Sequence, residues 1–250
     1  MERLSDRYQV LAADLYGYGR SPAWNGDRAL SLEDEVALIE PLLRHAGGPV
    51  HLIGHSYGAA VALRVALRHP QQVRSLSVYE PVLFSLLSTQ GYRHPAAKEI
   101  QEIRCQIDAA LRRRKAERAA RVFVDYWSGA GSFAALAAAT RDKIAAAMDK
   151  VQLNFGTADV DSVPLSTYRG IQIPTLYLHG AHSPWSTRQI AALLGFSLPR
   201  ADVCILEGLG HMGPLTHPER VNGLIEGFLQ HVDTQAIADA AAAQPESRVA

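Results

Sequence analysis

Fourteen residues decide the fold of this 250-residue chain: Val50-His51-Leu52-Ile53-Gly54-His55-Ser56-Tyr57-Gly58-Ala59-Ala60-Val61-Ala62-Leu63. A short, mostly apolar run at residues 50–53 predicts a buried strand. From Ala59 to Ala66, apolar residues recur at the spacing of a helix face. Because only five residues separate the two patterns, the sequence predicts a strand that turns sharply into a helix.

The turn has the pattern Gly-x-Ser-x-Gly, with a serine at position 56. Glycine lacks a Cβ, so Gly54 and Gly58 would let the strand and helix backbones approach closely. A serine at the tip of such a turn adopts a strained backbone conformation. Its hydroxyl would lie at the carboxyl edge of a sheet, above a helix N-terminus whose positive potential favours an anionic intermediate. The alternative is a glycine-rich turn with no chemical role.

Charge and composition narrow the possible partners. The chain carries 25 basic and 25 acidic residues, so neither nucleic acid nor an anionic membrane is indicated. Its start, Met1–Arg7, is polar, and no apolar run approaches the roughly 18 residues of a membrane span. The basic run Arg112–Lys115 is typical of a solvated helix face. Cys105 and Cys204 fit two buried free thiols in a reducing cytoplasm better than a disulfide.

Strand and helix patterns alternate along the rest of the chain. A further buried strand is predicted at residues 8–13, and strands are predicted at residues 73–79, 173–180 and 201–206. Helices are predicted at residues 31–46, 59–69, 185–194 and 221–232. A capping box at Thr216–Glu219 would open the last helix. Within 84–170, two Ala- and Arg-rich helical stretches, 98–126 and 133–151, meet without a convincing strand. The sequence therefore predicts an α/β fold with a helical insert.

Three glycine-rich segments resemble the α/β-hydrolase family: the Gly54–Gly58 turn, the D-x-x-G-x-G-x-S pattern of Asp14–Ser21, and Gly208–His211 after the last predicted strand. The resemblance implies a doubly wound, mostly parallel sheet with a helical cap. It divides the chain into a first core part at 1–83, the cap at 84–170, a second core part at 171–232 and a loose C-terminal tail at 233–250. Asp14 is expected to cap backbone amides of its own loop.

The same resemblance implies a catalytic triad, whose order along the chain is serine, acid, histidine. A serine hydroxyl is a poor nucleophile at neutral pH and needs a base within hydrogen-bond reach. Ser56 stands at the position of the nucleophile. His211 follows the last strand on a glycine-rich loop, where the family carries its base. The backbone N–H of Tyr57 would stabilise the oxyanion, together with an amide from an earlier loop.

The acid departs from the family pattern. The family usually carries an aspartate three residues after the glycine that ends the penultimate strand, and Ser183 stands at that offset from Gly180. Glu80 ends the strand after the elbow, and adjacent parallel strands lie only about 5 Å apart, so its carboxylate can reach the same histidine. We therefore expect Glu80 to be the acid and Ser183 to be dispensable. Asp159 and Asp161 are the reserve candidates.

The family also has a His-Gly oxyanion segment and a central strand before the segment that here begins at Asp14. The chain begins too late to contain either one. We therefore expect the first strands of the fold to be absent, and the chain to be an N-terminal truncation or to have a mis-assigned start. A missing central strand would leave backbone edges unpaired.

The resemblance implies a cofactor-free and metal-free serine hydrolase that cleaves a small ester through an acyl-enzyme. A C–C bond hydrolase, a thioesterase or an amidase is the alternative, because fold does not determine the bond that is cleaved. A dehalogenase is disfavoured, since it needs a carboxylate in place of Ser56. A non-catalytic protein of this fold that binds a ligand or partner is a second class, favoured by Ser183 and the missing oxyanion segment. The expected partner is a small acyl compound, and nothing indicates an oligomeric state.

Three aromatic residues of the insert are candidates for the lining of an acyl pocket: Tyr126, Trp127 and Phe133. They flank the glycine-rich break at Ser128–Ser132, between the two helical stretches. Large aromatic side chains of this kind supply apolar surface for a ligand. The alternative is that they only pin the cap to the core.

Overall fold

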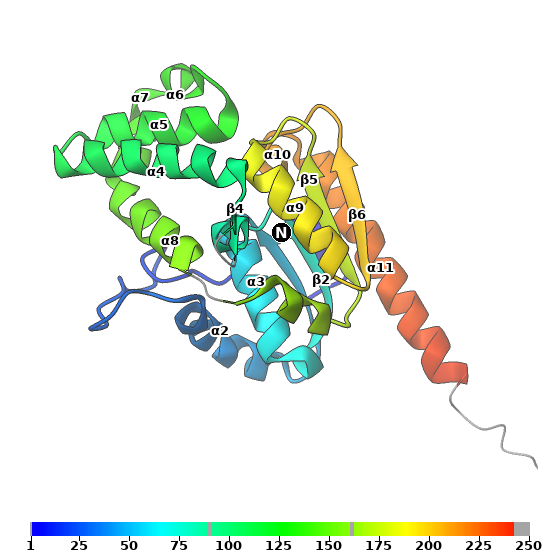
Figure 1. Cartoon of the computed structure of the whole chain (residues 1–250). Coiled ribbons are helices and arrows are strands. Elements are labelled where there is room, and N and C mark those ends of the chain that lie inside the picture. The colour runs from blue at the N-terminus through cyan, green and yellow to red at the C-terminus, as the bar shows by residue number, and fades with distance from the viewer. Residues whose placement is uncertain (1, 90–91, 161–162, 243–250) are drawn as a thin grey trace, which may run out of the picture.

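The computed structural model describes residues 2–89, 92–160 and 163–242. Its core is a parallel sheet of four strands in the order β1 (Val50–His55), β2 (Val73–Tyr79), β5 (Thr175–Gly180) and β6 (Ala201–Leu206). A separate two-stranded antiparallel ribbon joins β3 (Ser88–Thr89) and β4 (Tyr92–Arg93). Helices lie on both faces of the main sheet (Figure 1). The doubly wound, mostly parallel fold that the sequence predicts is therefore confirmed.

The two faces of the sheet are covered by different helices. One face carries α2 (Leu32–Ala46), α3 (Tyr57–Arg68) and α9 (Trp185–Ser197). The other carries α11 (Pro218–Ala242) and the short α1 (Glu2–Ser5). Side chains of β5 alternate between them, because successive residues of a strand point to opposite faces. Tyr177 packs with the first group, whereas Leu176 and Leu178 pack in the cluster that includes Val221 and Ile225 of α11.

Helix α2 begins and ends where the sequence predicts. The hydroxyl of Ser31 accepts the backbone N–H of Asp34, and the carboxylate of Asp34 accepts the backbone N–H of Ser31, which together form a capping box. Gly47 ends the helix with φ of 69°, a conformation that glycine adopts at little cost. Local capping chemistry therefore sets both ends of this helix.

Residues 8–13, predicted as a buried strand, form no strand, and Leu11 is 47% exposed. A strand needs a partner for its backbone hydrogen bonds, and among the described strands β1 pairs only with β2. The segment is held by side chains instead. The ring of Tyr8 packs edge-on against His51 at 5.7 Å between centroids, and its hydroxyl donates to Asp233 at 3.0 Å.

Along the chain, the cap is inserted between β2 and β5. It consists mainly of α4 (Pro95–Arg112), α5 (Ala116–Ser128), α6 (Ser132–Ala135), α7 (Ala138–Ala146) and α8 (Met148–Val160). The described residues also include three short 3-10 helices: η1 (Pro70–Gln72), η2 (Phe84–Leu87) and η3 (Leu165–Gly170). The two long helices predicted in the cap are both broken. One break lies at residues 113–115, where Arg114 has φ of 55°, and another at residues 136–137. Neither break contains Gly or Pro, the residues that usually mark the end of a helix in a sequence. The helical pattern therefore gives no sign of these breaks.

The C-terminal part corrects two further predictions. Thr216 opens no helix: it ends α10 (Gly213–Thr216), and its hydroxyl donates to the carbonyl of Met212 at 3.2 Å. The loose tail expected from residue 233 is wrong for residues 233–242, which continue α11. Residues 243–250 lie outside the described residues.

The surface and the two thiols are partly as predicted. The basic run Arg112–Lys115 is exposed. Both cysteines are free, but Cys105 is exposed on α4 and Cys204 is only partly buried, so the expectation of two buried thiols is wrong. None of the described helices is long and apolar enough to cross a membrane.

Candidate active site

The Gly-x-Ser-x-Gly turn forms where β1 ends and α3 begins. Ser56 lies at its tip with φ of 56° and ψ of −119°, a conformation that residues with a Cβ rarely adopt. Its N–H donates to the carbonyl of Tyr79 at 2.9 Å, and its own carbonyl accepts the N–H of Val82 at 3.4 Å. Strand β2 and the loop after it therefore hold the strained turn in place.

The two glycines of this turn differ in their roles. A Cβ on Gly54 would lie 2.6 Å from the Cα of Ala59, so only glycine fits between the strand and the helix. A Cβ on Gly58 would meet nothing within 4 Å. The expectation that Gly58 is needed for a close backbone approach is therefore wrong.

The structure brings Ser56, His211 and Glu80 together in one hydrogen-bonded chain. His211 Nε2 lies 3.0 Å from the Oγ of Ser56, and His211 Nδ1 lies 2.7 Å from Oε2 of Glu80. His211 is 2% exposed and Glu80 is fully buried. These distances are those of ordinary hydrogen bonds, so the histidine can accept the serine proton while its other nitrogen donates to the carboxylate.

The second carboxylate oxygen of Glu80 also has partners. It accepts the backbone N–H of Gly180 at 2.7 Å and the hydroxyl of Ser183. Burial acts to raise the pKa of Glu80, but the hydrogen bonds from His211, Ser183 and Gly180 outweigh it, and the pKa lies below its ordinary value. Glu80 is therefore ionised at neutral pH.

Ser183 has a role that the sequence alone did not reveal. It is 4% exposed, and its hydroxyl supports the carboxylate on the neighbouring strand. The two strand ends meet because β2 and β5 pair in register, with Tyr79 opposite Leu178. Gly180 allows the contact with the next loop, since a Cβ there would lie 2.3 Å from the carbonyl oxygen of Leu209. The sequence holds one signal for this contact. Ser183 stands at the position where the family usually carries its acid, and the strand after the elbow ends in a glutamate, Glu80.

Two side chains hold the loop of His211. The hydroxyl of Tyr79 donates to the carbonyl of Gly210 at 2.7 Å, and His55 Nε2 lies 2.9 Å from the carbonyl oxygen of His211. Burial, followed by the charge of His211, lowers the pKa of His55 to about 4. His55 is therefore neutral at pH 7, and its Nε2–H donates to that carbonyl. Sequence reasoning missed both contacts because they join residues 131 and 156 positions apart.

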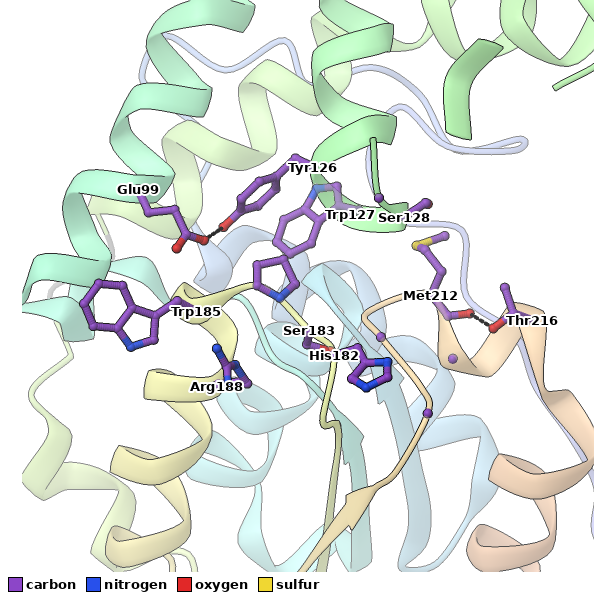
Figure 2. Close-up of a pocket in the computed structure, with 15 residues that line it drawn as sticks. Glu99, Tyr126, Trp127, Ser128, His182, Ser183, Trp185, Arg188, Met212 and Thr216 are labelled. Carbon is purple, nitrogen blue, oxygen red and sulfur yellow. Dashed lines mark hydrogen bonds between the residues drawn. The ribbon is translucent and has the colours of Figure 1, made fainter. Parts of the chain in front are cut away.

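Trp127 of α5 lines two cavities at this site. The smaller, of about 100 Å³, is lined by Ser56, Tyr57 and mostly apolar side chains of the cap. The larger, of about 660 Å³, lies between the cap and the loops that carry Ser183 and Met212 (Figure 2). The indole ring of Trp127 packs on the imidazole of His211, with 3.9 Å between ring centroids. Trp127 therefore contacts the histidine and forms part of both cavity walls.

The other two aromatic candidates, Tyr126 and Phe133, do not line the cavity that contains Ser56. Tyr126 lines the larger cavity, where its hydroxyl donates to Glu99 at 2.8 Å and lies 2.6 Å from the Oγ of Ser186 (Figure 2). Phe133 lines neither of these cavities and is fully buried. Its N–H donates to Asp125 at 2.8 Å. Phe133 therefore does not line an acyl pocket, and its contacts with Asp125 and Arg121 join α6 to α5 within the cap.

Tyr57 is the first residue of α3, so its backbone N–H has no acceptor within the helix and is available beside Ser56. The segment of the N-terminal part that reaches the Ser56 cavity is the Asp14 loop, through Tyr18. Asp14 itself accepts the N–H of Arg20 at 3.0 Å, which is the capping role expected of it. Of the reserve acids, Asp161 and the side chain of Asp159 lie outside the described residues.

Comparison with known proteins identifies the family. The model of the alpha/beta hydrolase family matches residues 1–224. The chain belongs to the alpha/beta hydrolase family. This hydrolase is 24% identical over 237 residues to (E)-2-((N-methylformamido)methylene)succinate hydrolase of Acinetobacter baylyi, a match covering 92% of this chain and 83% of that protein. It is 25% identical over 241 residues to pimeloyl-[acyl-carrier protein] methyl ester esterase of Yersinia enterocolitica, covering 94% and 88%.

A solved structure shares the fold of this hydrolase. MenH from S. aureus superimposes with a TM-score of 0.71 at 19% sequence identity, covering 93% of this chain and 87% of that chain. Within the described ranges, the hydrolase has no group of three or more His, Cys, Asp or Glu side chains placed to hold a metal ion.

Proposed function

We propose that this hydrolase cleaves small esters through an acyl-enzyme on Ser56, with His211 as the base and Glu80 as the orienting acid. The hydrogen-bonded chain from Glu80 through His211 to Ser56 carries the proposal. Its geometry is what general-base activation of a serine requires: one imidazole nitrogen on the hydroxyl and the other on a carboxylate.

In the first step, the Oγ of Ser56 attacks the ester carbonyl carbon while its proton passes to Nε2 of His211. The ionised Glu80 stabilises the imidazolium that forms. The carbonyl oxygen becomes an oxyanion beside the N–H of Tyr57 and the positive end of α3. The bond to the leaving oxygen then breaks, and this oxygen takes the proton from His211. Water attacks the acyl-enzyme by the same route and releases the acid.

The two cavities suit unequal parts of an ester. The cavity of about 100 Å³ beside Ser56 has room for about three water-sized groups and fits a short acyl portion. The cavity of about 660 Å³ fits a larger alcohol portion. A small acyl group on a larger alcohol is therefore the substrate class that the site supports.

Amide cleavage is the second candidate. The relative from Acinetobacter is named for an (N-methylformamido)methylene compound, and the relative from Yersinia for a methyl ester. The same serine chemistry serves both bonds, with His211 protonating a nitrogen in place of an oxygen. Rates on p-nitrophenyl acetate and on p-nitroacetanilide separate the two activities, and we expect the ester to be the better substrate.

A fluorophosphonate probe tests the proposal, because only an activated serine reacts with it. We expect the wild type to be labelled, and Ser56→Ala to be neither labelled nor active on p-nitrophenyl acetate while its circular dichroism is unchanged. An unlabelled wild type would contradict the proposal and favour a non-catalytic ligand-binding protein. Turnover retained in purified Ser56→Ala would remove Ser56 from the mechanism.

A further inference from the structure

Asn154 is a buried polar residue in a largely apolar cavity wall. It lies on α8, is 8% exposed and lines the cavity that contains Ser56. Its Nδ2 donates to the hydroxyl oxygen of Tyr18 at 2.7 Å, whereas its Oδ1 has no hydrogen-bond partner in the described part of the chain. An unpaired buried carbonyl is costly, so this position is suited to a polar group of a ligand.

Asn154 and Tyr18, which we call the polar pair, leave at least one hydrogen-bond donor and at least one acceptor unused. With Nδ2 donating to Tyr18, the unused groups include the O–H of Tyr18 and Oδ1 of Asn154. With the amide turned over, Tyr18 donates to Oδ1, and the unused groups include the N–H groups of Asn154 and a lone pair of the Tyr18 oxygen. Both arrangements complement a ligand group that donates and accepts side by side.

The polar pair is held by charged and polar neighbours. Lys150 Nζ lies 5.2 Å from the centroid of the Tyr18 ring and 3.6 Å from Oε1 of the fully buried Glu35. The hydroxyl of Thr157 donates to the carbonyl of Leu30 at 3.0 Å, which ties α8 to the core. Glu35 offsets the charge of Lys150, which does not line the cavity and whose Nζ makes no hydrogen bond within the described residues.

We propose that the polar pair recognises a neutral group that both donates and accepts hydrogen bonds, a carboxamide or a hydroxyl, on the short acyl portion of the substrate. The inference rests on the proposed function, since it names the class of acyl group that Ser56 receives. The cavity of about 100 Å³ limits that group to a few atoms beyond the scissile carbonyl. A carboxylate fits less well, because it has no hydrogen to give to the unused acceptor.

Three methyl esters of nearly equal size test the proposal: methyl malonamate, monomethyl malonate and methyl 3-methylbutanoate. Their acyl ends are a carboxamide, a carboxylate and an isopropyl group. Hydrolysis is followed by acid release, and each kcat/KM is divided by the hydroxide-catalysed rate of the same ester. We expect the wild type to prefer the malonamate about tenfold or more over each of the others, the size of a lost buried hydrogen bond.

Two variants remove the polar pair, and a third is the control. Asn154→Leu should lower the preference for the malonamate about tenfold, and Tyr18→Phe should lower it in the same direction. Gln152→Leu should leave it unchanged, because Gln152 is an amide on the same helix that donates to Asp108 at 2.9 Å and does not line the cavity.

Fluorophosphonate labelling of every variant distinguishes a failure of the proposed function from a failure of the inference about the polar pair. An unlabelled wild type overturns the proposed function and this inference with it. Labelled Asn154→Leu and Tyr18→Phe that keep the wild-type preference overturn the inference alone, as does a wild type that prefers the isopropyl or carboxylate ester. If Asn154→Leu fails to fold, the preference of Tyr18→Phe decides.

Discussion

Glu80 lies on the Nδ1 side of His211, and Ser183 supports the carboxylate of Glu80. Glu80 brings a charge from the end of β2, and Ser183 brings a hydroxyl from the loop after β5. Glu80 has a positive φ of 46°, which a residue with a Cβ adopts only when its surroundings impose it. Its backbone N–H donates to the carbonyl of Leu178 at 3.1 Å. Pairing with β5 therefore fixes the backbone from which the carboxylate projects.

Glu80→Gln should lose turnover on the order of 10⁴-fold, because the neutral amide cannot stabilise the imidazolium of His211. Ser183→Ala should lose about tenfold, since it removes a hydrogen bond to the buried carboxylate and leaves the charge in place. This replaces the expectation that Ser183 is dispensable. The measurement is kcat on p-nitrophenyl acetate, with the exposed Glu207→Gln as the control. Wild-type turnover in Glu80→Gln would exclude Glu80 as the acid.

His55 should make the protein less stable in mild acid. Its pKa is about 4 in the folded state, against about 6.5 in an unfolded chain. Below pH 6.5 the unfolded chain takes up a proton that the folded state excludes, so stability falls from pH 6.5 to 4 by up to about 3 kcal/mol. His55→Gln keeps a donor for the His211 carbonyl but does not titrate. Its free energy of unfolding in urea should therefore change less over this range; equal slopes would contradict the assignment.

At the scale of elements, α5 brings the cap to His211 through Trp127, whose indole packs on the imidazole. Trp127→Ala removes the indole that forms part of both cavity walls. The cavity at Ser56 should deepen, and kcat/KM on p-nitrophenyl octanoate relative to acetate should rise about tenfold. Absolute turnover should fall, since His211 loses its packing partner. Tyr126→Phe is the matched control and should keep the wild-type chain-length preference. An unchanged chain-length preference in Trp127→Ala would show that the indole does not limit the depth of the cavity.

Helix α11 packs against the sheet from Val221 to about Asp233, and the rest of the helix is exposed. Leu229 is 2% exposed in the cluster beneath the helix, whereas Ile237, two turns later, is 71% exposed. Leu229→Ala should lower the free energy of unfolding by about 2–5 kcal/mol. Ile237→Ala should change it by less than about 0.5 kcal/mol. Urea denaturation of the two variants checks the difference, and equal losses would show that the whole helix is packed.

Elements with local signals could be predicted from the sequence. The elbow, the capped helix α2 and the loop of His211 are each specified by glycines or capping residues within a few positions. The strand expected at residues 8–13 could not be judged this way, since a strand depends on a partner that the pattern does not reveal. The contacts of Ser183 with Glu80 and of His55 with His211 likewise join distant segments, and only folding brings them together.

At the scale of the whole molecule, the sheet ends on a strand with an open edge among the described residues. β1 pairs with β2 alone, and Ile53 on β1 is 47% exposed. Such edges are templates for pairing between molecules, which a charged residue suppresses. Ile53→Lys should therefore slow aggregation at high protein concentration, measured by light scattering. Phe196→Lys, which removes an 85% exposed apolar residue from α9, is the control and should have less effect.

The arrangement of two cavities around Trp127 has a kinetic consequence in the proposed mechanism. The alcohol leaves from the larger cavity while the acyl group stays on Ser56 in the smaller one. The vacated space of about 660 Å³ is then open to any incoming nucleophile of suitable size, not only to water. A second alcohol that fills it would take the acyl group from the serine and form a new ester. The size of that cavity therefore affects the ratio of hydrolysis to transesterification. Added alcohols should raise the share of transesterification.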